Sequence, residues 1–157
     1  MINGISKILV VNVKKGKEMT IKIQHGTWQN LHLAAQDIRE KVFIQEQHIP
    51  EHEEWDEMDD VSLHFIVWEN NHAIATARLL PNNSIGRVAV LKSHRGLGIG
   101  FKLMQEMILV ARQEQRKFLQ LSAQVHAISF YEKLGFQCEG PEYLDCEIPH
   151  ISMQMEM

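Results

Sequence analysis

The chain has 157 residues, about the length of one domain of roughly 150 residues. Hydrophobic residues make up 45% and charged residues 23%, which excludes a disordered or collagen-like chain. With 16 Lys and Arg against 20 Asp and Glu, the net charge is −4, so we expect no nucleic-acid-binding surface. No apolar run suits a membrane span or signal peptide, and two cysteines fit free thiols in a reducing compartment. The sequence predicts one cytoplasmic domain without a membrane partner.

Regular hydrophobic periodicity begins only after the first 18 residues. We therefore expect residues 1–18 to be a peripheral N-terminal extension and residues 19–157 to be a single domain. A short strand is predicted over residues 20–24. Apolar residues at three- and four-residue steps then predict an amphipathic helix that begins near Thr27, a favourable cap. Asn70 and Asn71 separate two apolar segments and predict a β-hairpin, because Asn tolerates the backbone of tight turns.

The second half of the chain alternates strands and helices. A strand is predicted over residues 85–91, a long helix over 98–115 and a strand over 118–123. A short helix over 127–134 ends at Gly135, and a last pair of strands surrounds Pro141. The methionines of the long helix have the spacing of core residues. The order predicts a mixed α/β domain with a strand–helix–strand crossover.

A glycine-rich turn joins the strand over 85–91 to the long helix, in the sequence "LKSHRGLGIGFKLM". Glycines let the backbone approach a ligand closely, and the first turn of a helix offers free N–H groups to an anion. Arg95 adds a positive charge suited to phosphate. The pattern fits neither a dinucleotide fingerprint nor a Walker loop, because the sixth position from Gly96 is Phe101 and no Gly-Lys-Ser/Thr follows.

The spacing of Arg95, Gly98 and Gly100 after a Val-rich strand resembles the acetyl-CoA signature of the GNAT acetyltransferase superfamily. "AISFYEKLGF" (127–136) resembles its second landmark, and "VFIQEQ" (42–47), "IGRVAV", "AQ" (123–124) and "IPHISM" resemble the ElaA-like branch. The resemblance implies an α+β fold: a mixed sheet of six to seven strands, about four helices and a splayed strand pair at the acetyl-CoA site. Gln124 stands where many members carry an asparagine, so the contacts of that asparagine are not carried over.

The resemblance further implies direct acetyl transfer from acetyl-CoA to an amine, without an acyl-enzyme. Its cofactor-binding residues correspond here to Val88, Ala89, Val90, Arg95, Gly96, Leu97, Gly98, Ile99, Gly100 and Phe130. The acceptor is expected to be a small-molecule amine, and the acidic segment that follows Glu46 in the chain favours a cationic one. Acetylation of a protein or peptide amine, and a non-catalytic acyl-CoA-binding domain, remain open, as do a monomer and a homodimer.

Tyr131 and Glu46 are the candidate catalytic residues. The family places a tyrosine near the thioester sulfur, where the phenol of Tyr131 can protonate the departing thiolate. Glu46 can deprotonate the incoming ammonium, or serve only as a solvated glutamate. His64 and His150 are further base candidates because imidazole titrates near neutrality, although a lone strand histidine is more often structural.

Residues 51–60, "EHEEWDEMDD", hold seven acidic residues. Two interpretations stay open: a negative field that attracts a cationic amine, or a solvated mobile loop. No metal site is expected, because His-Glu-x-x-His and Cys-x-x-Cys are absent and Pro50 separates His48 from His52. A thiol nucleophile is not expected either, because no base lies near Cys138 or Cys146 in the sequence.

Overall fold

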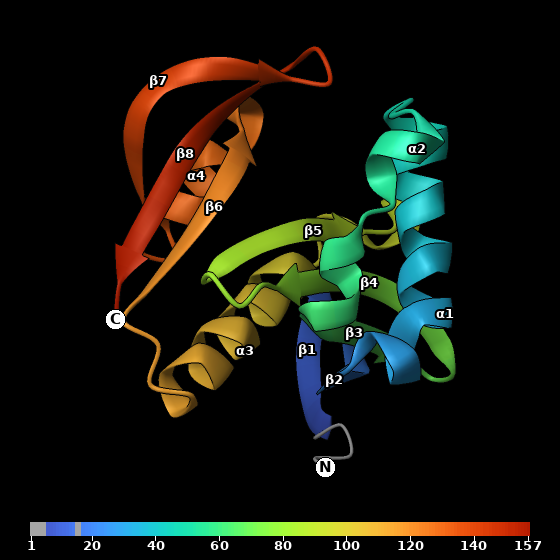
Figure 1. The fold of residues 1–157 in the computed structure, drawn as a ribbon. Helices are drawn as coiled ribbons and strands as arrows, with labels where there is room; N and C mark the ends of the chain where they lie inside the picture. The colour runs from blue at the N-terminus through green and yellow to red at the C-terminus, as the bar shows by residue number, and fades with distance from the viewer. Residues whose placement is uncertain (1–5, 15–16) are drawn as a thin grey trace.

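A computed structural model describes residues 6–14 and 17–157, which form one eight-stranded sheet flanked by helices (Figure 1). The strands are β1 (Ser6–Lys14), β2 (Lys17–Gly26), β3 (Leu63–Glu69), β4 (His72–Leu79), β5 (Ser84–Val90), β6 (Phe118–Gln124), β7 (Gln137–Asp145) and β8 (Ile148–Glu156). The α-helices are α1 (Trp28–Arg39), α2 (Glu51–Glu54), α3 (Ile99–Gln113) and α4 (Ile128–Glu132). A π-helical segment, Glu40–Glu46, extends α1. The expected α+β class is confirmed.

The strand order is β1-β2-β3-β4-β5-β6-β8-β7, and β5–β6 is the parallel pair. The helix α3 connects β5 to β6, as the predicted crossover requires. The β3–β4 hairpin turns at Asn70, whose φ of 55° is the left-handed conformation that Asn tolerates. The side chain of Thr27 caps α1 by accepting a hydrogen bond from the backbone N–H of Asn30 at 3.4 Å.

The sheet has one strand more than the six to seven expected, because residues 6–14 form the edge strand β1. This strand pairs antiparallel with β2 and buries Val11 against the core, while Ile8 and Val10 remain exposed. The expected boundary at residue 19 therefore falls inside β2, whose pairing with β1 begins at Lys17. That the domain folds without this strand stays a prediction.

The strands β5 and β6 pair only at their beginnings, through Ser84 with Gln120 and Ile85 with Leu121. A register shift between β4 and β5 lies at the same level, where Arg87 has a φ of 52°. Such an irregularity bends a strand and re-aims its side chains. The two strands separate beyond Gly86, and Figure 1 shows β6, β7 and β8 diverging from the rest of the sheet. The expected splayed pair is present.

Helices cover both faces of the sheet. The apolar side of α3 packs into the main core, where Leu103, Met104 and Met107 are completely buried. On the other face, α1 packs Leu31 and Ala35 against β3. Within the residues that the structure describes, no helix combines the length and apolar character needed to cross a membrane.

Candidate functional site

A cavity of about 1000 Å³ occupies the space where β5 and β6 separate. Its wall comes from the π-helical end of α1, the strand β5, the start of α3, the region from β6 to α4, and the β7–β8 turn. All the predicted site residues line this cavity except Leu97, whose side chain packs against the core. Segments up to about 100 residues apart in sequence thus meet at one site.

The glycine-rich turn forms one end of the cavity, which we call the cofactor end. Gly96 and Gly98 have φ angles of 77° and 82°, which L-residues with side chains rarely adopt. Gly98 is also the N-cap of α3, and no side chain caps this helix. The first backbone N–H groups of α3 are therefore available to an anion at the helix terminus.

Arg95 lies beside this turn and is held by two contacts. Its Nη1 and Nη2 atoms donate to the two carboxylate oxygens of Glu46 at 2.6 and 2.9 Å, and its Nε donates to the carbonyl of Val90 at 3.0 Å. The hydrogen bonds from Arg95 lower the pKa of Glu46. The ion pair thus joins the residue predicted to bind phosphate to the residue predicted to act as base.

Strand β5 forms one wall of the cavity through Val88, Ala89 and Val90. Ala89 is buried and packs against the end of α1, whereas Val88 and Val90 are half-buried. Beyond Ile85 this strand has no partner on its β6 side in the described residues. Its backbone is therefore positioned to pair with an extended ligand in place of a strand.

Tyr131 lies on the opposite wall, within an aromatic group. Its ring packs edge-to-face with Phe130 at a centroid distance of 5.0 Å and with Phe136 at 6.1 Å. Burial raises the pKa of the Tyr131 hydroxyl to about 12. The phenol therefore stays protonated at neutral pH and can donate a hydrogen bond or a proton.

The opposite end of the cavity, which we call the acceptor end, is bounded by α2 and the β7–β8 turn. The structure corrects the expectation of a solvated mobile loop over residues 51–60, because this segment forms α2 and a 3₁₀ turn, Glu57–Val61. Three of its seven acidic residues join three arginines from elsewhere in the chain. This buried ionic cluster consists of Glu54, Asp56, Asp59, Arg39, Arg78 and Arg87.

Arg39 lies at the centre of the cluster. It is 1% exposed and donates to Glu54 at 2.7 Å and to Asp59 at 2.7 Å. Its guanidinium also lies over the rings of Trp28 and Trp55, at 5.5 and 4.9 Å. Opposite charges this deeply buried need close pairing, since an unpaired charge in the interior is costly.

Two further arginines attach the acidic segment to β4 and β5. Arg78 donates to Asp56 at 2.6 Å and lowers the pKa of Asp56 to about 2. Arg87 donates to the carboxylate of Glu54 at 3.0 Å and to the carbonyl of Glu54 at 2.9 Å. These hydrogen bonds hold the side chain of Arg87, whose backbone has a positive φ. The sequence reasoning missed these arginines, although one signal was present: Arg78 interrupts an apolar strand.

His64 also belongs to this region and does not line the cavity. It is 1% exposed, its Nε2 lies 2.9 Å from the Asp59 carbonyl, and burial lowers its pKa. These contacts give His64 a structural role, as expected for most strand histidines. His150, by contrast, lines the cavity.

The β7–β8 turn reaches across the acceptor end. The thiol of Cys146 donates to Glu53 Oε2 at 2.6 Å, and this contact connects the turn to α2. Figure 1 shows the tip of this hairpin extending toward α2. The Glu53 carboxylate raises the pKa of Cys146 to about 12, so the thiol is a poor nucleophile at neutral pH. Nearby, the side chain of Gln124 donates to Gln47 at 3.1 Å.

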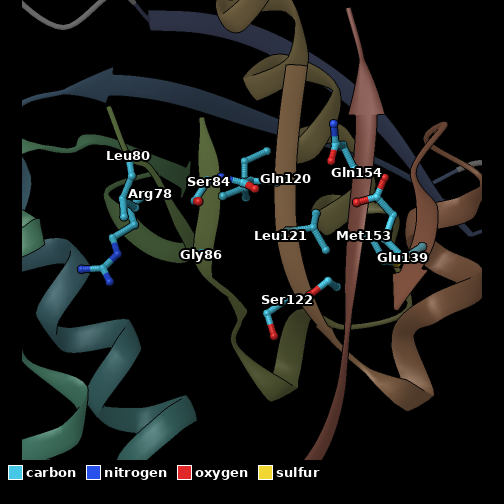
Figure 2. A pocket seen from close by; sticks show the side chains of 12 residues that line it. Arg78, Leu80, Ser84, Gly86, Gln120, Leu121, Ser122, Glu139, Met153 and Gln154 are labelled. Atoms are coloured by element: carbon cyan, nitrogen blue, oxygen red, sulfur yellow. The ribbon is translucent and has the colours of Figure 1, made fainter. Parts of the chain in front are cut away.

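A second cavity of about 350 Å³ adjoins the first where the strands begin to separate. Both cavities are lined by Ile85, Gly86, Leu121 and Ser122. Figure 2 shows this space between β5 and β6, with the Arg78 guanidinium directed away from β6. Its other polar side chains include Ser84, Gln120, Ser152 and Gln154. The acceptor end thus continues into a polar recess.

Comparison with known proteins gives concordant matches. The family model described as "Acetyltransferase (GNAT) domain" matches residues 27–157. The uncharacterized N-acetyltransferase YjcF of Bacillus subtilis is 34% identical over 123 residues, 76% of this chain and 88% of that protein. Escherichia coli ElaA is 31% identical over 83% of this chain and 96% of its own, and its crystal structure superimposes with a TM-score of 0.78. An Elizabethkingia anophelis GNAT acetyltransferase with acetyl-CoA bound shares the fold at 20% identity, with a TM-score of 0.66 over 87% of this chain and 98% of that one.

Proposed function

Because the chain belongs to the GNAT acetyltransferase family, we propose that it transfers the acetyl group of acetyl-CoA directly to a primary amine of a small molecule. Both substrates occupy the cavity together, so no acyl-enzyme forms. Membership of the family identifies the chain as an N-acetyltransferase. The proposal concerns which donor and which acceptor it uses.

The cofactor end supports acetyl-CoA as the donor. The pyrophosphate would bind the backbone N–H groups of residues 96–100 at the start of α3, where the helix dipole favours an anion. The pantetheine arm would lie along the unpaired side of β5, beside Val88 and Val90. Acetyl-CoA bound to the Elizabethkingia relative is consistent with this donor.

The contact between α2 and the β7–β8 turn is the observation that carries the small-molecule proposal. The hydrogen bond between Cys146 and Glu53 joins these two elements beside the cavity, which Cys146 lines, so they do not form the separate walls of an open groove for a protein chain. A cavity of about 1000 Å³ lies at the upper end of the usual range for small-molecule sites, enough for the reactive arm of the cofactor and a small amine.

Tyr131 is the proposed acid. Its hydroxyl is protonated at neutral pH because burial raises its pKa to about 12, and it lines the same cavity as the glycine-rich turn. In this role it protonates the sulfur of CoA as the thioester breaks. Glu46 holds Arg95 beside the turn, and its lowered pKa makes it a weak acceptor of protons.

The test is release of CoA from acetyl-CoA in the presence of defined amines. We expect release with at least one member of a panel that contains spermidine, glucosamine and an Nα-blocked lysine, and no release without an amine. Mass spectrometry of the product should show an added acetyl group on the amine nitrogen. Activity confined to lysine-containing peptides would replace the small-molecule proposal, and tight binding of acetyl-CoA without any transfer would indicate a non-catalytic acyl-CoA-binding domain.

A further inference from the structure

His150 occupies a defined position at the acceptor end of the cavity. It lies on β8, opposite Gln124 of β6, and only 9% of it is exposed. Its ring stacks on Tyr143 at a centroid distance of 6.1 Å and an interplanar angle of 23°. The histidine lines the cavity from this packed position, so its ring is both held and accessible.

A backbone contact decides the tautomer of His150. Its Nδ1 atom lies 2.7 Å from the carbonyl oxygen of Ile148. A carbonyl only accepts hydrogen bonds, so Nδ1 carries the hydrogen and donates it. The lone pair of the neutral ring is then on Nε2. Among the described residues Nε2 has no hydrogen-bond partner, so its lone pair is available to accept a proton.

The alternation of β8 places His150 on the acceptor side of the sheet. Side chains two residues apart share a face, so His150, Ser152 and Gln154 lie together on one face of β8, and Ser152 and Gln154 line the polar recess. Met153 lies on the other face and is buried in the main core. Tyr131 packs against that same core. Tyr131 and His150 both line the cavity.

Glu46, the other candidate base, is placed differently. Both of its carboxylate oxygens accept hydrogen bonds from Arg95 at the cofactor end. An ammonium group at this site would therefore compete with Arg95 for the charge of the carboxylate. His150 has no such competing partner on Nε2 within the part of the chain described.

We propose that His150 is the general base of the transfer, an assignment that rests on the proposed function. Its Nε2 takes one proton from the ammonium group of the acceptor. The freed nitrogen lone pair attacks the thioester carbonyl, a C–N bond forms and the C–S bond breaks. The sulfur receives a proton from the Tyr131 hydroxyl, and the second proton lost by the nitrogen restores that hydroxyl. His150 then releases its proton to solvent, which completes the proton balance.

The test compares His150→Asn with Glu46→Gln, using the panel amine that the wild type acetylates fastest. Asparagine keeps an N–H donor near the position of Nδ1 but has no basic nitrogen. We expect kcat/KM for the amine to fall by about 100-fold or more at pH 7, since general base catalysis contributes 10²–10⁴-fold. The Kd for acetyl-CoA should stay within about twofold of the wild type, because the substituted side chain lies away from the glycine-rich turn.

The pH profile separates a base from a structural residue. A rising limb of kcat/KM with pH, the signature of a general base, should be present in the wild type and in Glu46→Gln, and absent in His150→Asn. The elements packed against β8 carry these titratable groups: Cys138, Glu139, Glu142, Tyr143 and Asp145 on β7, Cys146 and Glu147 in the turn, and His126 before α4. A rising limb that persists in His150→Asn, or a fall in kcat/KM of less than threefold, overturns the assignment.

A second measurement is independent of turnover. Nitrogen-15 NMR of the labelled imidazole should show neutral His150 with the hydrogen on Nδ1, and a neutral ring with the hydrogen on Nε2 overturns the assignment.

Failure of the proposed function would give a different result from failure of the His150 assignment. If the wild type releases no CoA with any amine, the proposed function is wrong and the assignment falls with it. If the wild type is active and His150→Asn is equally active, only the assignment is wrong.

Discussion

The two ends of the cavity are built from different kinds of structure. The cofactor end uses one continuous segment, residues 95–100, and offers mainly backbone groups fixed by glycines with positive φ. The acceptor end uses side chains from α2, β5, the β7–β8 turn and β8. It is supported from behind by the buried ionic cluster.

This difference predicts how each end responds to mutation. A site made of backbone fails when the backbone conformation changes, and the rest of the domain is little affected. A site assembled from distant segments fails when the contacts that hold those segments together are lost. The five predictions below test the contrast, beginning with the largest effect.

Loss of Arg39 should be the most damaging single change. Arg39→Met leaves Glu54 and Asp59 buried without their central cation, and breaking a buried ion pair costs about 3–5 kcal/mol. Chemical denaturation should show the free energy of unfolding reduced by that amount. The matched control is Lys41→Met, which removes an exposed pair with Asp37 and should have little effect. Equal stability of the two variants would contradict the support given by the ionic cluster.

Gly98→Val should weaken acetyl-CoA binding strongly and destabilise the fold only moderately. No atom lies within 4 Å of an added Cβ, so the cost comes from the φ of +82° and amounts to about 1–3 kcal/mol. Displacing two backbone donors, each worth about 1.5–3 kcal/mol to a charged group, should weaken acetyl-CoA binding by roughly 100-fold or more. Gly140→Val is the control, because Gly140 has a φ of +72° and lies outside the cavity. Calorimetry should find weakened binding only in the first variant.

Tyr131→Phe tests chemistry at the boundary between the two ends. The ring and its contacts with Phe130 and Phe136 are kept, while the proton donor is lost. Turnover should fall at least tenfold, within the usual range for general acid help, and the Kd for acetyl-CoA should hardly change. Unchanged turnover in single-turnover measurements would leave Tyr131 as a packing residue.

Deletion of residues 1–18 should leave both ends of the cavity working. The deletion removes β1, whose contribution to the core includes the buried Val11, and exposes the edge of β2. Burial of one such side chain is worth about 1.5–3 kcal/mol, so we expect Tm to fall by about 5 °C. Acetyl-CoA binding should be retained. Loss of binding, or failure to fold, would show that β1 is essential to the domain.

Neutralising the exposed acidic residues that are expected to attract a cationic acceptor should give the smallest effect. Asp56 and Asp59 are bound to arginines, so the exposed Glu51, Glu57 and Asp60 are the residues to neutralise. The triple change to Gln, Gln and Asn should raise KM for spermidine about twofold to threefold at low salt and lose its effect at high salt, as screening predicts. KM for acetyl-CoA should stay level or fall. An equal, salt-independent rise for both substrates would exclude electrostatic attraction.

The sequence predicted the elements whose signals are local. Thr27 caps α1, Asn70 turns the β3–β4 hairpin, and Gly98 begins α3, because each depends on the backbone conformation or hydrogen bonds of a few neighbouring residues. The edge strand β1 was missed. Its pairing with β2 is a tertiary contact, and its exposed Ile8 and Val10 give no clear alternation of buried and polar positions.

Residue type and motif order alone determined the fold class, the glycine-rich turn and the presence of Tyr131 near it. Only the tertiary structure decided that Glu46 pairs with Arg95, that Arg39 and Arg87 bind the acidic segment, and that Nε2 of His150 has no hydrogen-bond partner among the described residues. The physical reason is the range of the interactions. Backbone conformation is decided within a few residues, whereas an ion pair or a tautomer depends on which distant segment the fold brings within hydrogen-bond distance.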